Sequence, residues 1–187
     1  MMSRAFIAAG SNIDPEKNIR SAVRLLGNHA RVVDSSTFYR TEPLGRPDRP
    51  FYLNGVIEIE TDMPPEKLKR DVLRRIERHL GRVRTPDRYA PRTIDLDLIA
   101  YDDIVMHTPE LVLPHPDIAA RPFVAVPLAE LAPDLIFPGS TTSIRDIAAS
   151  FSRAGMMPLD GFSQELRREI SHDRQAAGHE ETRTPHS

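Results

Sequence analysis

The sequence predicts an α+β protein with a ferredoxin-like β-α-β-β-α-β core, a mostly antiparallel sheet covered by helices, and helical additions at the C-terminal end. Two observations lead to this prediction. Four short segments rich in apolar, β-branched and aromatic residues are typical of strands. Two segments with apolar residues at helical spacing lie between the first and second strands and between the third and fourth.

The first strand and the first helix are predicted from residues 4–27. Arg4 to Gly10 (RAFIAAG) is a short apolar run that ends in Gly-Ser-Asn, as a buried strand does. Asp14-Pro15-Glu16 then predicts a helix start, with an N-cap, a first-turn proline and a first-turn acid. The helix ends near Gly27, and its apolar residues at helical spacing are Ile19, Ala22, Val23, Leu25 and Leu26.

Two strands and a second helix follow. Residues 31–41 (RVVDSSTFYRT) predict the second strand, and residues 51–61 (FYLNGVIEIET) alternate in polarity and predict the third. The segment 42–50 between them (EPLGRPDRP) is dense in proline and glycine and predicts a loop. Residues 64–80 predict the clearest helix, with one apolar stripe made of Leu68, Val72, Leu73, Ile76 and Leu80.

The fourth strand is preceded by an arginine-rich loop, residues 81–93, and spans residues 94–101 (IDLDLIAY). A tight turn at Asp102-Asp103 follows it. Beyond this turn we expect a proline-spaced segment through His115 and two helices, at about 123–131 and 143–151. We assign residues 1–160 to one domain and expect residues 161–187 to be a polar tail, partly helical or disordered, and solvated from Ser163 onward.

The bulk composition excludes several classes. With 187 residues, 40% apolar and 28% charged, the chain is long enough for one globular domain. A net charge of −2 and a pI near 6.4 argue against a general nucleic-acid or membrane partner. The absence of cysteine excludes disulfides and thiolate metal sites. The first residues are too short an apolar run for a signal or a span, so we expect a cytoplasmic location. We also expect a monomer that acts on small molecules.

The expected topology brings the unusual segments together. If the crossovers are right-handed, strands one and two run parallel with strand three between them, and strand four lies antiparallel beside strand one. The end of strand one (Gly10-Ser11-Asn12), the starts of strands three and four, and both loops then fall at one end of the sheet. We therefore expect a site at that end.

Two acids in the fourth strand, Asp95 and Asp97, point to that site. Because strand side chains alternate, both carboxylates lie on one face, roughly 6–7 Å apart along the chain. One interpretation is that both pair with arginines of the adjoining loop. The other is that they hold a hard divalent cation such as Mg²⁺ together with substrate phosphates. Guanidinium groups match phosphate oxygens, so the loop residues Arg82, Arg84, Arg88 and Arg92 favour a nucleotide polyphosphate site.

Other candidate site residues can each be interpreted in two ways. His115, between prolines in LPHPD, and Arg121 are either structural or ligands of nucleotide phosphates. No Walker-type glycine loop occurs, and Gly10-Ser11-Asn12 is only a weak phosphate or turn signal. The segments Thr41–Gly45 and Tyr52–Asn54 suit a small planar heterocycle, although the aromatic residues also suit an ordinary core.

From Arg4 to about Phe151 the chain resembles the 6-hydroxymethyl-7,8-dihydropterin pyrophosphokinase family of folate biosynthesis. The matching segments, in order, are AFIAAGSN, SSTFYRTEPLG, YLN, GRVR, RYAPRTIDLDLIAYD, LPHPDIAARPFVAVPLAELAP and FP. The resemblance implies transfer of a pyrophosphoryl group from ATP to the pterin hydroxymethyl oxygen, with release of AMP.

The resemblance also implies site roles. Asp95 and Asp97 would hold two Mg²⁺ ions and, with Arg82 and Arg92, form the catalytic group. The residues implied to bind ATP are Arg84, Arg88, His115 and Arg121. Those implied to form the pterin pocket are Thr41, Pro43, Leu44, Tyr52, Asn54, Tyr89 and Phe123. This sequence departs from the family pattern at four positions, with Tyr89 in place of a common tryptophan, Thr85 in place of a basic residue, Pro116 in place of an aromatic one, and an added acid at Glu42.

Two other functions remain open at this point. One is a nucleotide- or RNA-binding module on a ferredoxin-like sheet, which usually stacks bases on sheet aromatics. The other is a metal-dependent phosphohydrolase, which needs the same acids and a water-activating base. Release of AMP that depends on the pterin discriminates the pyrophosphokinase from both.

Overall fold

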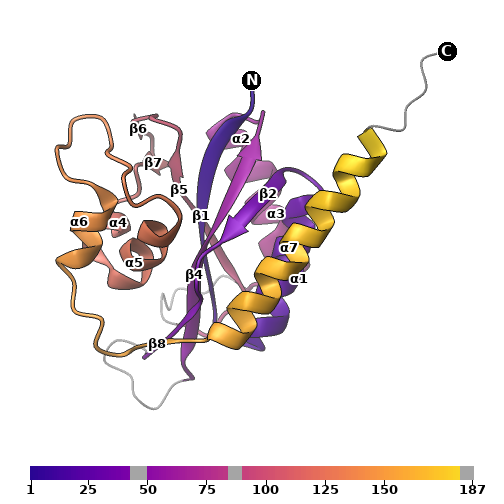
Figure 1. Cartoon of the computed structure of the whole chain (residues 1–187), viewed down its shortest axis with the longest axis horizontal. Helices are drawn as coiled ribbons and strands as arrows, with labels where there is room; N and C mark the ends of the chain where they lie inside the picture. Colours follow the sequence, from indigo (N-terminus) through magenta and orange to yellow (C-terminus); the bar gives the residue numbers. More distant parts are fainter. Residues whose placement is uncertain (43–49, 84–89, 182–187) are drawn as a thin grey trace.

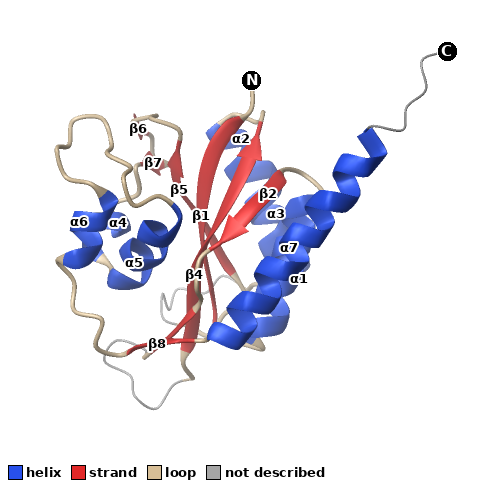
Figure 2. Cartoon of the chain, viewed as in Figure 1, coloured by secondary structure: helices blue, strands red, loops and turns tan. Residues whose placement is uncertain are grey.

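The sheet lies between two layers of helices. The computed structural model describes residues 1–42, 50–83 and 90–181. Helices α4 (Asp117–Ala120), α5 (Pro122–Leu131) and α6 (Ile144–Ala149) cover one face, and α1 (Pro15–Gly27), α3 (Arg74–His79) and α7 (Asp160–Glu181) cover the other (Figures 1 and 2). No helix in the described ranges is long and apolar enough to cross a bilayer.

The sheet has the strand order β5-β1-β4-β3-β8, and β2 also pairs with β4. β1 is antiparallel to both β4 and β5, and β2 is antiparallel to β4, so β1 and β2 run parallel with β4 between them. The predicted α+β class and strand arrangement are confirmed. The strands are β1 (Ser3–Ser11), β2 (Arg31–Ser35), β3 (Tyr39–Thr41), β4 (Tyr52–Thr61), β5 (Asp95–Tyr101) and β8 (Met156–Pro158), and β6 (Met106–His107) and β7 (Val112–Leu113) form a separate pair.

Alternation along the strands divides the core in two. In β1, Ala5, Ile7 and Ala9 face α1, α3 and α7 in the larger cluster, whereas Phe6 faces α4, α5 and α6 in the second. In β5, Leu96 and Leu98 enter the larger cluster. This alternation places Asp95 and Asp97 on the other face, beneath the α4–α6 layer.

The predicted second strand, residues 31–41, is interrupted. Ser36 ends the pairing of β2 with β4, because its hydroxyl accepts a hydrogen bond from Val56 N at 2.8 Å. Phe38 then turns fully into the larger cluster, and β3 begins at Tyr39. A polar residue within the β-branched run therefore divides one expected strand into two.

The helix predicted for residues 64–80 is irregular. It begins as α2 (Pro65–Lys67), continues as a π-helical stretch η1 (Leu68–Leu73) and ends as α3. At the start of α1, Asp14 precedes the helix as expected, but its φ of 40° is left-handed and its side chain makes no capping hydrogen bond. The predicted turn after β5 is present, with Asp102 at φ 43°.

The C-terminal segment is not a solvated tail over its whole length. Residues 160–181 form the single helix α7, and Phe162, Ser163, Leu166 and Ile170 are buried in its first half. The three apolar residues recur every four positions and join the larger cluster. Burial of each such side chain stabilises the fold by about 1.5–3 kcal/mol. The polar composition of the segment had favoured a solvated tail instead.

Candidate active site

Three neighbouring strands place the predicted site residues in one row. Asp95 of β5 pairs with Gly10 of β1, and Gly10 pairs with Asn54 of β4. Paired residues point to the same face, so the Asp95 carboxylate and the Asn54 amide project from one surface. Because adjacent strands lie about 4.8 Å apart, the backbones of these two residues are separated by roughly 10 Å. Asp97, opposite Ala8, lies on the same face as Asp95.

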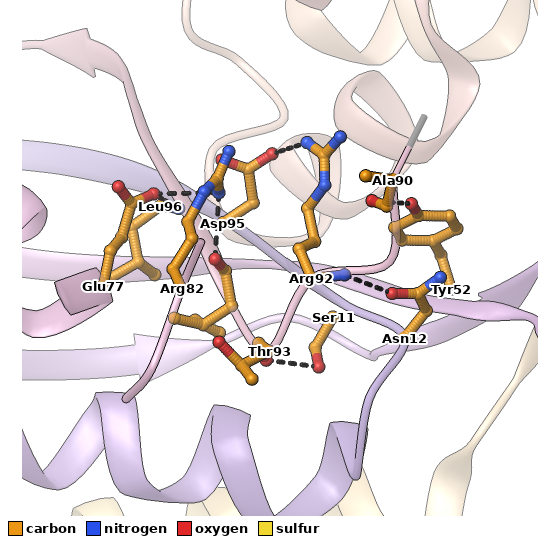
Figure 3. A network of polar contacts seen from close by, with 11 residues as sticks. Ser11, Asn12, Tyr52, Glu77, Arg82, Ala90, Arg92, Thr93, Asp95 and Leu96 are labelled. Atoms are coloured by element: carbon orange, nitrogen blue, oxygen red, sulfur yellow. Dashed lines mark hydrogen bonds and ion pairs between the residues drawn. The ribbon is translucent and has the colours of Figure 1, made fainter. Parts of the chain in front are cut away.

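Two arginines hold Asp95. Arg82 Nη1 donates to one carboxylate oxygen and Arg92 Nη1 to the other, so that they reach Asp95 from two sides (Figure 3). Burial raises the pKa of Asp95, but the charges and hydrogen bonds of Arg82 and Arg92 outweigh it and lower that pKa below its usual value. Arginine pairing, the first of the two interpretations, therefore holds for Asp95. Each carboxylate oxygen retains a second lone pair for another partner.

Asp97 is placed differently. It makes no hydrogen bond or ion pair with any residue in the described ranges, although it lies close to Asp95. Burial and the negative charge of Asp95 raise the pKa of Asp97, and the neighbouring His115 and Lys69 offset only part of this effect. An ionised Asp97 is thus unfavourable until a cation joins it.

These two acids fit a magnesium ion that shares its coordination with a substrate. Within the described ranges there is no group of three or more His, Cys, Asp or Glu side chains that could hold a metal alone. Mg²⁺ typically takes one or two carboxylates and completes its shell with water and phosphate oxygens. Asp95 and Asp97 provide the two carboxylates of such a coordination shell.

A buried acid that the sequence analysis did not identify orients Arg82. Glu77 in α3 is 3% exposed and accepts from Arg82 Nη1 at 3.1 Å and from Leu96 N at 3.0 Å. Arg82 Nη1 also donates to the carbonyl oxygen of Ile94 at 2.9 Å. Glu77 lies four residues after Leu73 and three before Leu80 of the apolar stripe, and this spacing, which places it on the buried side of the helix, is its sequence signal.

The Gly-Ser-Asn corner of β1 orients Arg92. Arg92 N donates to Asn12 Oδ1 at 2.7 Å, and Ser11 Oγ donates to the carbonyl oxygen of Thr93 at 2.5 Å (Figure 3). Asn12 N also donates to the carbonyl oxygen of Arg92 at 3.2 Å. The sequence analysis treated this corner as a weak phosphate signal, whereas the structure uses it to fasten the segment that carries Arg92 to β1.

The amide of Asn54 is also fixed. Its Nδ2 donates to Thr41 Oγ1 at 2.7 Å, across β4 and β3. A Cβ added to Gly10 would lie 2.6 Å from Asn54 Oδ1, so glycine makes room for this side chain. Tyr52 donates to the carbonyl oxygen of Ala90 at 3.4 Å, and its ring centre lies 6.0 Å from the Arg92 guanidinium. Thr41, Tyr52 and Asn54 thus form one group beside the acids.

Of the remaining predicted residues, three lie in the described ranges and contact other parts of the fold. His115 is tied to β5 by a hydrogen bond from its N to the carbonyl oxygen of Ile99 at 2.8 Å. Asp117 lies between His115 and Arg121. His115 Nδ1 is 3.9 Å from Asp117 Oδ2, and Arg121 Nε is 4.0 Å from Asp117 Oδ1. Phe123, in the first turn of α5, packs on the second core cluster. Pro43, Leu44, Arg84, Arg88 and Tyr89 lie outside the described residues.

Comparison with known proteins decides the family. Residues 6–133, well over half of the chain, match the profile of the family described as 7,8-dihydro-6-hydroxymethylpterin-pyrophosphokinase. The chain belongs to this family. The resemblance inferred from its motifs is therefore confirmed, and the chain is an enzyme, a pyrophosphokinase of folate synthesis.

Relatives of this pyrophosphokinase cover most of its length. It is 39% identical over 162 residues to the 2-amino-4-hydroxy-6-hydroxymethyldihydropteridine pyrophosphokinase of Haemophilus influenzae, covering 85% of this chain and 99% of that protein. It is 41% identical over 158 residues to the protein of the same name from Methylorubrum extorquens, covering 83% and 98%. The folic acid synthesis protein fol1 of Schizosaccharomyces pombe is 37% identical over 161 residues, which are 84% of this chain and 22% of that protein.

Solved structures agree in fold. A crystal structure of Plasmodium falciparum HPPK-DHPS A437G with STZ-DHP superposes with a TM-score of 0.64 at 12% identity. The match covers 80% of the pyrophosphokinase chain and 45% of the solved chain, so the chain spans less than half the length of that protein. At this identity the likeness extends to the fold alone.

Proposed function

We propose that the chain transfers the pyrophosphoryl group of ATP to the hydroxymethyl oxygen of 6-hydroxymethyl-7,8-dihydropterin, with Mg²⁺, giving the pterin diphosphate and AMP. The observation that carries this proposal is the row Asp95–Gly10–Asn54 on three adjacent strands. In this row the two acids of β5, and the two arginines that pair with Asp95, are separated from the oriented amide of Asn54 by the single strand β1. A polyphosphate and a polar heterocycle would therefore lie within reach of each other.

In this proposal Asp95 and Asp97 hold two Mg²⁺ ions together with phosphate oxygens. When bound, the metal neutralises phosphate charge and lowers the pKa of the acceptor hydroxyl. The raised pKa of Asp97 supports this assignment, because a cation at that position relieves the repulsion between the two acids.

Arg82 and Arg92 supply positive charge where charge develops during transfer. They are held by Glu77 and Asn12 and by Asp95 itself, so little reorganisation is needed when the substrates react. We assign phosphate contacts to Arg84, Arg88, His115 and Arg121. No general base stands out, so positioning and electrostatics carry most of the rate, as in phosphoryl transfer generally.

We assign the pterin to the surface beside Asn54. There the amide of Asn54 and the hydroxyl of Thr41 present fixed hydrogen-bonding groups, and the aromatic rings of Tyr52 and Phe123 offer faces for the heterocycle. Pro43, Leu44 and Tyr89 complete the pocket in this proposal. We further propose that the enzyme acts as a cytoplasmic monomer on these small molecules, without nucleic-acid or membrane partners.

A substitution at Gly10 tests the pterin assignment. In Gly10→Ala the new methyl group displaces the Asn54 amide, which is the only group it meets within 4 Å in the described part of the chain, and breaks its bond to Thr41. We expect the pterin KM to rise about tenfold or more, with little change in the ATP KM. Steady-state kinetics with each substrate varied in turn measures this. Gly27→Ala, where a Cβ meets nothing within 4 Å, serves as the control. Equal effects on both KM values would contradict the assignment.

The reaction itself is tested by a coupled assay of AMP release with ATP, Mg²⁺ and the pterin. We expect release to require all three and to stop when a chelator removes the metal. Hydrolysis of ATP without the pterin would instead indicate a phosphohydrolase. Binding of both ligands without turnover would indicate a binding module.

A further inference from the structure

The C-terminal helix α7 lies beyond residues 6–133, which match the family profile. We propose that α7 is a positioning element of the pterin pocket, and that it acts through Phe38 on the Thr41–Asn54 pair. The inference rests on the proposed function for the identity of the ligand. Its structural part rests only on contacts within this chain.

The start of α7 fixes the backbone of Phe38 on both sides. Phe38 N donates to the buried hydroxyl of Ser163 at 2.9 Å, and Leu159 N donates to the carbonyl oxygen of Phe38 at 2.9 Å. Ser163 Oγ in turn donates to the carbonyl oxygen of Leu159 at 2.8 Å. The Phe162 ring meets the Phe38 ring edge to face, with centroids 5.6 Å apart. Phe38 therefore has little freedom while α7 is docked.

Two features hold α7 against the rest of the molecule. Arg20 of α1 lies with its guanidinium 5.4 Å from the centre of the Phe162 ring and forms ion pairs with Glu165 and Glu169. Leu166 and Ile170 are buried in the larger cluster. In Figure 1, α7 runs alongside α1 and β2 on the face opposite α5.

Phe38 transmits this constraint to β4. Its ring lies so close to Gly55 that a Cβ on Gly55 would come within 2.7 Å of Phe38 Cδ1. Gly55 directly follows Asn54, and Phe38 directly precedes β3, in which Tyr39 pairs with Asn54. The strand just before α7, β8, pairs with the other edge of β3, with Met156 opposite Thr41. The position of Thr41 relative to Asn54 thus depends on where Phe38 is held.

The test uses Ser163→Ala, which removes the acceptor of Phe38 N without removing α7. We expect the pterin KM to rise about fivefold. The rise is moderate because the unsatisfied Phe38 N–H destabilises the free protein as well as the pterin complex, and only the difference between the two changes the KM. The kcat and the ATP KM should change by less than about twofold. Phe162→Leu, which removes the ring contact, should act in the same direction.

Hydrogen exchange of the ligand-free protein provides a second readout. Amides of residues 38–41 should exchange several-fold faster in Ser163→Ala than in the wild type, because the start of β3 is released. Ser171→Ala is the matched control, because it removes a serine hydroxyl from an exposed position of the same helix. It should leave both the pterin KM and the exchange of residues 38–41 unchanged.

The outcomes separate the two proposals. Unchanged exchange at 38–41 in Ser163→Ala, or an equal rise of the pterin KM in the control Ser171→Ala, would overturn the role of α7. A wild-type protein that neither binds nor turns over the pterin would overturn the proposed function and the pterin part of this inference. The exchange comparison would still decide whether α7 sets the position of β3.

Discussion

The Asp97→Asn variant is expected to release AMP at about a thousandth of the wild-type rate or less, and to be at least as stable as the wild type. The loss of turnover follows from the loss of a charged metal ligand of nearly unchanged shape. The stability follows from the raised pKa of Asp97, because a carboxyl whose pKa is higher in the folded than in the unfolded chain loses stability when it ionises, and asparagine carries no charge. Steady-state AMP release and thermal unfolding measure the two effects.

Asp103 provides the control for this prediction. It lies in the exposed turn at the opposite end of β5, and Asp103→Asn should leave turnover unchanged. Near-normal turnover in Asp97→Asn would remove the metal assignment. A marked fall in its melting temperature would show that Asp97 has a structural role instead.

Arg82→Ala is expected to lower kcat about 10²- to 10³-fold, because it removes a fixed positive charge from the phosphate path. It should also destabilise the protein by about 3–5 kcal/mol, because the buried Glu77 and the Asp95 carboxylate both lose the positive charge of Arg82. Turnover and denaturant unfolding of the same preparations measure both quantities.

The two effects of Arg82 can be separated by a second substitution. Adding Glu77→Gln to Arg82→Ala removes the buried negative charge that Arg82 faces in the wild type, and we expect it to restore part of the stability and none of the turnover. If turnover recovered together with stability, the role of Arg82 would be structural rather than electrostatic.

The sequence was sufficient to predict the geometry of the sheet end. Alternation in DLDL determines that Asp95 and Asp97 share a face, and the crossover rule places β5 beside β1. Both are local or topological rules, so they needed no knowledge of side-chain packing. The choice between arginine pairing and metal binding was different, because it depends on which side chains approach each acid in three dimensions. Among the described residues the acids differ, because Asp95 is paired with arginines there and Asp97 is not.

Several supporting residues were not predictable for the same reason. The role of Glu77 becomes visible only when α3 is packed beside β5, because its partners are Arg82 and Leu96. The division of the second strand at Ser36 arises because the Ser36 hydroxyl, and not a backbone carbonyl, accepts the hydrogen bond of Val56 N. The burial of α7 was predictable in principle from the four-residue spacing of its apolar side chains, but its polar composition favoured a solvated tail.

In the proposed function the metal and pterin sites share one face of the sheet, and the single strand β1 separates them. This arrangement is tested most directly by replacing Mg²⁺ with paramagnetic Mn²⁺ in the presence of a non-hydrolysable ATP analogue and observing the side-chain amide of Asn54 by NMR. The backbones of Asp95 and Asn54 are roughly 10 Å apart, so an ion held by the two acids should broaden that signal beyond detection in the wild type, and the signal should persist in Asp97→Asn. A sharp Asn54 signal in the wild type with Mn²⁺ and the analogue bound would contradict the account.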